Sequence, residues 1–400
     1  MKLRVLFFLS ILCWVCHPVQ AQTENDSIPS DTVAADSLEI SLMTCGQAPM
    51  VYALYGHTAI RVRNLNTGED WAFNYGSFDM SAPFFVPKFI FGIMDYELGC
   101  STFEEFAYRY SRWGTDITQQ VLNLTPHEKD RMLNRLVENY KPENRGYRYN
   151  FIYDNCCTRP RDIVEEIVDG SVVYPTDSVA VTYRDLVHHY NNPWPWSKFA
   201  IDLVFGQEAD QVLTLRQHEF LPEYLMQHFD KCVIKDKSGA ERPLVLSTSV
   251  INAQFPFDNS KEFFLSPMQC AIIWLVLSLL ILGYEIWRKR LLWGYDIPVF
   301  LTQGGAGLIV FLLFFFSDHP TVGSNWLILL LNPIPLFYLP WMICKGRKRK
   351  KDLYHTINMY FLVLFLLSLT IIPQNIPLEI IPLSLVLLTR SVSHVLLCKK

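Results

Sequence analysis

Five long apolar runs fill the last third of the chain and constrain its fold most strongly. Each has 17 or more residues, close to the length that an α-helix needs to cross the hydrocarbon core of a bilayer. Burial in one soluble core is a poor alternative for five such runs, so the sequence predicts a membrane bundle of about five transmembrane helices over residues 263–400. The expected spans are 263–284, 297–317, 322–344, 356–372 and 380–398.

Basic residues fix the expected orientation of this half. Lys and Arg follow the first, third and fifth spans, whereas the loops after the second and fourth spans contain neither. Because basic loops stay in the cytoplasm, residue 262 is expected on the opposite side of the membrane. Arg390 is a charge inside an apolar run. Such a residue is a functional candidate, but snorkelling to the interface or a shifted helix end is the interpretation that we favour.

The N-terminal 40 residues have the features of an export signal and a linker. A positively charged start is followed by the short apolar run 5–15 and a small-residue cleavage site ending at Ala21, which predicts a signal peptide over 1–21. An uncleaved anchor is the alternative. Residues 22–40 are polar and lack aromatic side chains, so a disordered linker is expected there. Residues 41–262 are then a soluble domain in the periplasm, held at the bacterial inner membrane.

Composition and cysteine usage exclude some classes of function. The net charge is −4, and the basic residues do not form a groove with interleaved aromatics, so nucleic acid is not an expected partner. No second pair of ligands stands at a spacing typical of a metal site, and neither metal nor cofactor is expected. The exported domain holds an odd number of cysteines, which leaves at least one thiol unpaired. They are Cys45, Cys100, Cys156, Cys157 and Cys232.

Local patterns in the exported domain predict strands and helices. From His57 the sequence alternates apolar and polar residues, and the turn at 66–68 leads into a returning strand over 71–75. Residues 102–112 read as helical. A Thr-Pro-His-Glu start at 125–128 predicts a capped helix that ends near residue 140.

Cys156, His57 and Asn74 form a candidate catalytic group. Asp154 or Asn155 caps a helix whose first turn holds Cys156. A helix N-terminus favours a thiolate, and its N–H groups can stabilise an oxyanion. A strand histidine can accept and return a proton, and Asn74 on the partner strand can orient it. The residues alone leave open an inert core cysteine, a structural histidine, a vicinal disulfide and half of a metal site.

Longer motifs add a resemblance to known families. The motif GHTAI at 56–60, followed much later by Asn155-Cys156, resembles the circularly permuted branch of the papain-like superfamily, to which lecithin:retinol acyltransferase belongs. The motifs YGHTAIRV, FNYGSFD, YNFIYDNCCTRPRD and PW…D…G…AD, followed by membrane helices, resemble the Lnb family of lipoprotein N-acyltransferases. The resemblance implies an α+β, permuted papain-like periplasmic domain with Cys–His chemistry, followed by an all-α membrane bundle.

The same resemblance assigns roles to individual residues. Cys156 is the expected nucleophile because it directly follows Asn155, His57 is the base, and Asn74 is the expected orienting residue. Two arginines share the first helical turns with Cys156 and are expected to bind a lipid phosphate, with salt bridging as an equally open alternative. The expected substrate-binding residues are Arg159, Arg161, Asn155 and Tyr75.

The expected reaction is a thiol acyl transfer in two halves. The cysteine takes an acyl chain from a membrane phospholipid as a thioester, and the α-amine of a diacylglyceryl-cysteine lipoprotein then accepts it. Two alternatives remain at this point. One is a papain-like peptidase or amidase that acts on peptidoglycan, and the other is a non-enzymatic membrane assembly or sensor protein.

Overall fold

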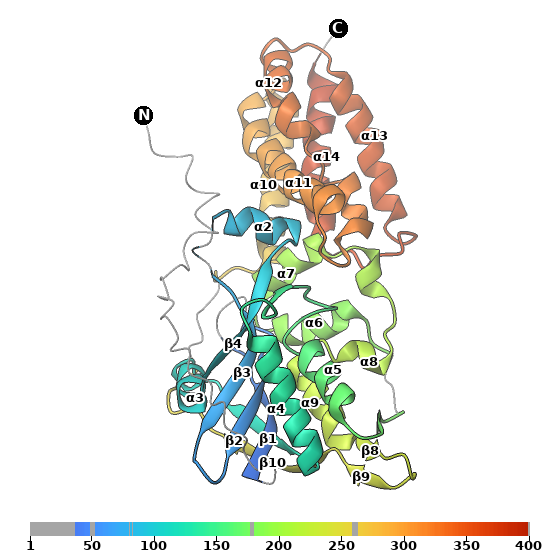
Figure 1. Cartoon of the computed structure of the whole chain (residues 1–400). Helices are drawn as coiled ribbons and strands as arrows, with labels where there is room; N and C mark the ends of the chain where they lie inside the picture. The colour runs from blue at the N-terminus through green and yellow to red at the C-terminus, as the bar shows by residue number, and fades with distance from the viewer. Residues whose placement is uncertain are drawn as a thin grey trace.

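A sheet-rich domain and a bundle of helices make up the chain, with α2 (Phe85–Phe91) and α7 (Pro195–Val204) between them (Figure 1). The expected signal peptide and linker residues 22–36 lie outside the described residues. The computed structural model describes residues 37–48, 53–79, 81, 83–176, 180–257 and 263–398.

The sheet has seven antiparallel strands in the order β10-β5-β1-β2-β3-β4-β6. The linker expected over 22–40 ends too late, because Leu38 and Ile40 are buried in β1 between β5 and β2. Their alternation with polar residues is typical of a strand, but it follows a long polar stretch that hides it. The strands are β1 (Leu38–Cys45), β2 (His57–Asn64), β3 (Asp70–Ser77), β4 (Asp95–Thr102), β5 (Ile117–Leu122), β6 (Gly146–Arg148) and β10 (Val245–Ile251).

Helices cover both faces of this sheet. On one face, α4 (Pro126–Tyr140), α5 (Thr158–Ile167) and α9 (Pro222–Lys231) bury the larger hydrophobic core. On the other face, α3 (Phe103–Arg112) buries a smaller core. The capping box expected at the start of α4 is present, because Thr125 and Glu128 exchange side-chain to backbone hydrogen bonds.

Smaller elements complete the exported domain. The helices α6 and α7 and the segment through α8 enclose a third cluster of buried hydrophobic residues. A three-stranded sheet of order β7-β8-β9 lies beside the main sheet. These elements are α6 (Tyr183–Asn191), η3 (Gln207–Asp210), α8 (Leu215–His218), β7 (Ser171–Val173), β8 (Val233–Lys235) and β9 (Glu241–Pro243).

The C-terminal region is helical, and four segments within its described residues 263–398 are long and apolar enough to cross a membrane. The helix expected at 356–372 is shorter, with 16 residues and a length of about 24 Å. The span expected at 322–344 is interrupted, because prolines at 333 and 335 lack the N–H that a continuous helix needs. The elements are α10 (Pro267–Arg288), α11 (Asp296–Phe316), η5 (Val322–Ser324), η6 (Trp326–Leu329), α12 (Ile334–Arg347), α13 (Leu353–Ser368) and α14 (Ile380–Leu397).

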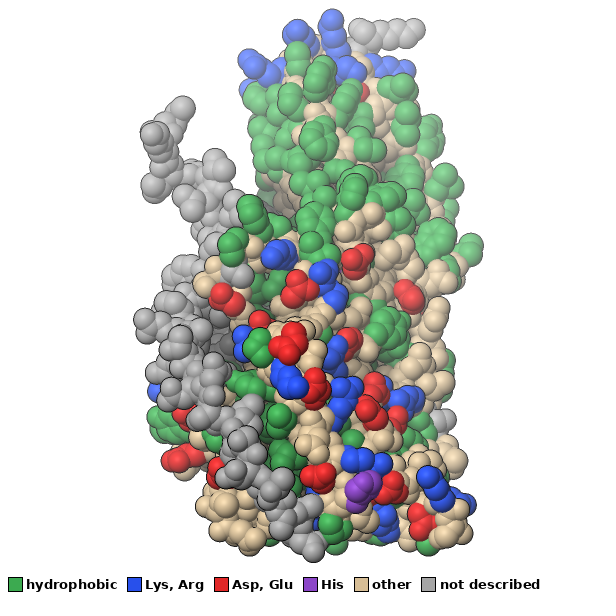
Figure 2. Space-filling view, in the orientation of Figure 1, with side chains coloured by type: hydrophobic (Ala, Val, Ile, Leu, Met, Phe, Trp, Pro, Cys, Tyr) green, Lys and Arg blue, Asp and Glu red, His purple; other side chains and the backbone are tan. Residues whose placement is uncertain are grey.

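The surface of the bundle matches its predicted orientation. Figure 2 shows hydrophobic side chains along the bundle and Lys and Arg side chains at the end farthest from the sheet domain. This basic end contains the C-terminal ends of α10 and α12, where Arg288 and Arg347 lie. By the positive-inside rule it faces the cytoplasm, so the sheet domain lies on the other side.

Arg390 lies inside the bundle, and the expectation that it snorkels to the interface is wrong. Its side chain is fully buried and donates to Asp296 Oδ1 at 2.7 Å and to Glu285 Oε2 at 2.8 Å. Ser393 donates to the same Glu285 carboxylate, and His394 Nε2 bonds Asp296 Oδ2 at 2.8 Å. Full pairing removes the need for Arg390 to reach water. The cluster joins α10, α11 and α14.

The segment that joins α7 to η3 docks the sheet domain on the bundle. Gly206 N donates to Thr321 O at 3.1 Å, and Asn325 Nδ2 donates to Leu203 O at 2.8 Å. A Cβ at Gly206 would lie 2.5 Å from the Ser324 carbonyl carbon, so only glycine permits this approach. Asp210 accepts two hydrogen bonds from Asn375, in the loop between α13 and α14. The PW…D…G…AD segment thus belongs to the contact between the two parts.

Candidate active site

Strand register places His57 and Asn74 on one face of the sheet. His57 begins β2, Asn74 lies in β3, and Ile60 pairs with Phe73 across these strands. Because side chains alternate along a strand, His57 and Asn74 both point away from the face that carries Ile60. They meet near the end of the sheet, where the chain also brings the start of α5 and Cys156.

The imidazole of His57 is held on three sides. Its Nε2 hydrogen-bonds Asn74 Oδ1, and its ring stacks on Tyr110 with centroids 6.1 Å apart and planes inclined by 11°. Gly76 has a φ of +123°, and a Cβ there would lie 3.4 Å from His57 Cε1. An amide oxygen only accepts hydrogen bonds, so His57 Nε2 carries the proton that is donated to Asn74. The other ring nitrogen, Nδ1, is then available to the Cys156 thiol.

Asn155 builds the turn that presents Cys156. Its Oδ1 accepts from the backbone N–H of Cys157 at 2.8 Å and of Thr158 at 3.0 Å. Its Nδ2 donates to two backbone carbonyls, at 2.7 and 2.9 Å. Arg159 N donates to Asn155 O at 3.3 Å, so Cys156 lies in a hydrogen-bonded turn that leads directly into α5 at Thr158.

The surroundings of Cys156 favour its thiolate. A hydrogen bond from the Cys157 thiol lowers the pKa of Cys156 most. Burial opposes this, but the His57 charge, a bond from His57 and the Thr58 backbone N–H lower the pKa further, to well below its usual value. Burial raises the pKa of Cys157 well above its usual value, so Cys157 stays a neutral donor. Thr58 Oγ1 lies 3.3 Å from Cys157 Sγ and continues this chain of hydrogen bonds.

The same pairing stabilises the protonated form of His57. Burial by itself lowers the pKa of His57. The negative charge of Cys156 and the hydrogen bonds with Cys156 and Asn74 outweigh burial, so the pKa of His57 is raised. A lowered cysteine pKa and a raised histidine pKa together favour a thiolate–imidazolium pair, the reactive form of a thiol nucleophile.

Comparisons with known families match both parts of the chain. The Lnb N-terminal periplasmic domain matches residues 24–192, and the Lnb transmembrane domain matches residues 258–400. The chain belongs to the Lnb family. No curated protein and no solved structure matches it. Membership of the Lnb family implies a role in lipoprotein biogenesis and suggests an acyltransferase.

Two residues of the site in this Lnb-family chain were not anticipated from sequence. Cys45 pairs with His57 across β1 and β2, and its buried thiol hydrogen-bonds Tyr110. Burial, and then the charge of Cys156, raise the pKa of Cys45 well above its usual value, so this thiol is neutral. The register of β1 against β2 brings Cys45 to His57, and the placement of α3 brings Tyr110 to Cys45. Neither is visible as a local pattern in the sequence.

The two arginines near Cys156 are paired with carboxylates. Arg159 forms a bidentate pair with Asp154, at 2.6 and 2.8 Å, and its guanidinium lies 3.8 Å from the Tyr147 ring centroid. Arg161 is buried and bonds Asp162 at 2.8 Å, with Glu219 at 3.5 Å. These are the salt bridges that the sequence left as the alternative to phosphate binding.

Asn155 and Tyr75 have structural partners in this Lnb-family chain. All four hydrogen-bonding positions of the Asn155 amide are used, three within the turn and one with the backbone carbonyl of Phe220, so its side chain positions Cys156. Tyr75 is buried on the opposite face of β3 from Asn74, and its hydroxyl accepts from Asn139 at 2.6 Å. Within the described residues, no group of three or more His, Cys, Asp or Glu side chains could hold a metal ion.

Proposed function

We propose that this chain is a lipoprotein N-acyltransferase of the bacterial inner membrane. It moves an acyl chain from a phospholipid to the α-amine of a diacylglyceryl-cysteine lipoprotein through a thioester on Cys156. The observation that carries the proposal is the Cys156–His57 pair, with Asn74 on His57, in a periplasmic domain docked on a membrane bundle. Both substrates reside in the bilayer, which gives that docking a purpose.

In the first half-reaction, the Cys156 thiolate attacks an ester carbonyl of the phospholipid. Asn155 Oδ1 accepts from the N–H groups of Cys157 and Thr158, so the Cys156 N–H is the backbone donor of this turn that we assign to the oxyanion. His57 imidazolium donates its proton to the departing alkoxide as the ester C–O bond breaks. The products are the Cys156 thioester and a lysophospholipid.

In the second half-reaction, the α-amine of the lipoprotein attacks the thioester carbonyl. His57, now neutral, accepts the proton of the amine, and the C–S bond breaks to return the thiolate. The product is a triacylated lipoprotein. Asn74 keeps the imidazole aligned in both halves by holding its Nε2–H.

The test is the N-terminal mass of one reporter lipoprotein in cells that lack their own N-acyltransferase. The intact chain should add one acyl chain, Cys156→Ala should add none, and Cys270→Ala, which alters a cysteine in α10, should behave as the intact chain. If the intact chain is present in the membrane and adds no acyl chain, the proposal fails, and peptidoglycan amide bonds become the substrates to test.

A further inference from the structure

The short helix α2 lies where the sheet domain meets the end of the bundle. Ser317 Oγ donates to Ile90 O at 2.8 Å, and Asp318 N donates to Phe91 O at 2.9 Å. His319 Nε2 donates to Phe89 O at 2.6 Å. These bonds attach α2 to the periplasmic end of α11, and Figure 1 shows α2 across the base of the bundle. The helix therefore lies at the level of the membrane surface.

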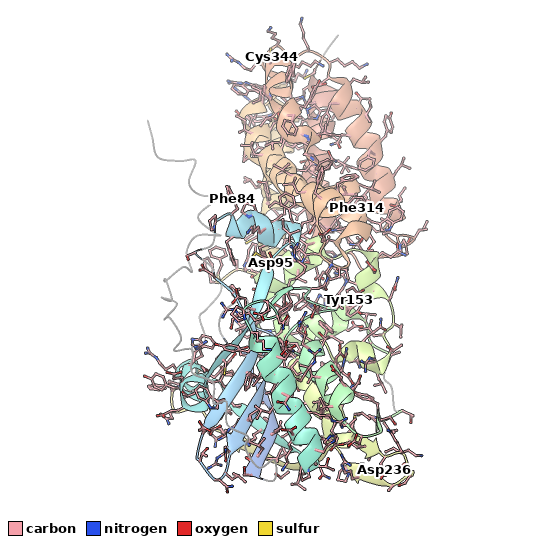
Figure 3. The ribbon with its side chains drawn as sticks, in the orientation of Figure 1. Phe84, Asp95, Tyr153, Asp236, Phe314 and Cys344 are labelled. Carbon is pink, nitrogen blue, oxygen red and sulfur yellow. The ribbon has the colours of Figure 1, made fainter. Side chains whose placement is uncertain are left out.

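Aromatic side chains of α2 continue the apolar surface of the bundle. Phe84 is 77% exposed and Phe89 is 49% exposed, and Phe316 at the end of α11 is 60% exposed. Figure 3 shows Phe84 at the outer end of α2. Phe84 has a φ of 59°, a strained conformation for a bulky residue, and its exposed ring gains little packing within the chain. An exposed aromatic beside a lipid-facing surface is typical of a membrane interface.

A row of stacked rings runs from α2 into the sheet domain. The ring centroids of Phe89 and Phe85 are 6.5 Å apart, and those of Phe85 and Phe78 are 5.8 Å apart. The spacing falls to 4.9 Å between Phe78 and Tyr96 and to 4.1 Å between Tyr96 and Tyr149. All four pairs lie within 23° of parallel. We call these five residues the aromatic row.

The inner end of the aromatic row and the nucleophile pack against one core cluster. Cys156 packs against the same core cluster as Phe78, Phe85 and Tyr149, and Tyr96 is a buried member of that cluster. Burial, with the charge of Cys156 as a second cause, raises the pKa of Tyr96 to about 12. Burial raises the pKa of Tyr149 well above its usual value, and the charge of Cys156 also contributes. The row is therefore exposed at the membrane end, partly buried in the middle and, at its inner end, part of the core cluster that Cys156 also contacts.

We propose that the aromatic row is the surface on which the acyl chain of the phospholipid donor lies while its ester reaches Cys156. The inference rests on the proposed function. The rings offer continuous apolar contact, and the row begins at the bilayer surface and ends in the core cluster against which Cys156 packs. The row thus lets one chain leave the leaflet without crossing the charged surface of the sheet domain.

Photo-crosslinking in the full-length chain tests the contact directly. p-Benzoylphenylalanine is placed singly at Phe78, at Phe85 and at Tyr108, an exposed aromatic on α3 that serves as the control. The protein is embedded in vesicles of phosphatidylethanolamine with 16-carbon chains, and adducts are identified by mass spectrometry. Lipid adducts at Phe78 and Phe85 but not at Tyr108 are expected. Adducts at Phe85 alone would show that lipid stops at α2, and would overturn the inference.

Acylation kinetics give a second readout. Phe78→Ser should slow formation of the Cys156 thioester from the phospholipid by roughly tenfold, because apolar contact with a long chain is lost. Acylation of the Phe78→Ser variant by p-nitrophenyl acetate should be unchanged. The Phe78→Leu variant should keep most of the wild-type rate of thioester formation from the phospholipid. Equal losses on both donors would overturn the inference. A wild-type thioester without adducts at Phe78 overturns the inference alone, whereas no wild-type thioester at all overturns the proposed function with it.

Discussion

Replacing Cys157 by alanine should raise the pKa of the Cys156 thiol by about one unit. The Cys157 thiol donates to the Cys156 thiolate across a Sγ–Sγ distance of 3.9 Å, and this bond is the largest cause of the lowered pKa. A hydrogen bond to a charged group contributes roughly 1.5–3 kcal/mol. A thiol is a weak donor and the distance is long, so the lower end applies. About 1.4 kcal/mol corresponds to about one pKa unit.

The assay is the pH dependence of alkylation by iodoacetamide, followed at Cys156 by mass spectrometry. The alanine variant should need a higher pH for half-maximal alkylation, because less thiolate is present at each pH. Cys157→Ser keeps a donor at this position and should stay within about half a unit of the intact chain. An unchanged pKa in the alanine variant, or the same rise in the serine variant, would refute the role given to Cys157.

Three further substitutions test the packing around the site and the docking of the domain. Asn74→Ala removes a bond that raises the pKa of His57, so the alkaline limb of the acylation pH profile should move to lower pH, with the maximal rate reduced on the order of tenfold. Gly76→Ala adds a methyl 3.4 Å from the His57 ring at a positive φ, and calorimetry should show a loss of about 1–2 kcal/mol of stability. Gly206→Ala brings a Cβ within 2.5 Å of Ser324; acylation by phospholipid in vesicles should fall while acylation by p-nitrophenyl acetate persists.

Elements with a strong local signal were predicted well. The α4 helix begins and ends where its capping box and apolar spacing indicate, at Pro126 and Tyr140. The strand that begins at His57 follows from alternation, and the turn before α5 follows from its capping asparagine. Capping and alternation involve residues close in sequence, so the positions of Cys156 and His57 in the fold are readable without knowledge of the tertiary structure.

Features that depend on tertiary contacts were not predictable in the same way. The contacts of Cys45 and Tyr110 at His57 require the register of β1 and the placement of α3. The carboxylate partners of Arg161 include Glu219, which is 58 residues away. Hydropathy counts apolar residues without testing helix continuity, so it did not show the break that the prolines impose before α12. Composition could not show that the polar linker gives way to β1 at Leu38.

The buried charges of the bundle impose an order on its assembly. Glu285 and Asp296 enter the membrane with α10 and α11, but their partner Arg390 follows 105 and 94 residues later, on the last helix. Until α14 inserts, these two carboxylates, which lie at the cytoplasmic ends of α10 and α11, lack the cation that pairs them in the finished bundle. The early helices are therefore only provisionally placed during synthesis. Insertion of α14 supplies Arg390 and fixes α10 and α11 in place. A truncated chain that ends before residue 380 should therefore be unstable in the membrane.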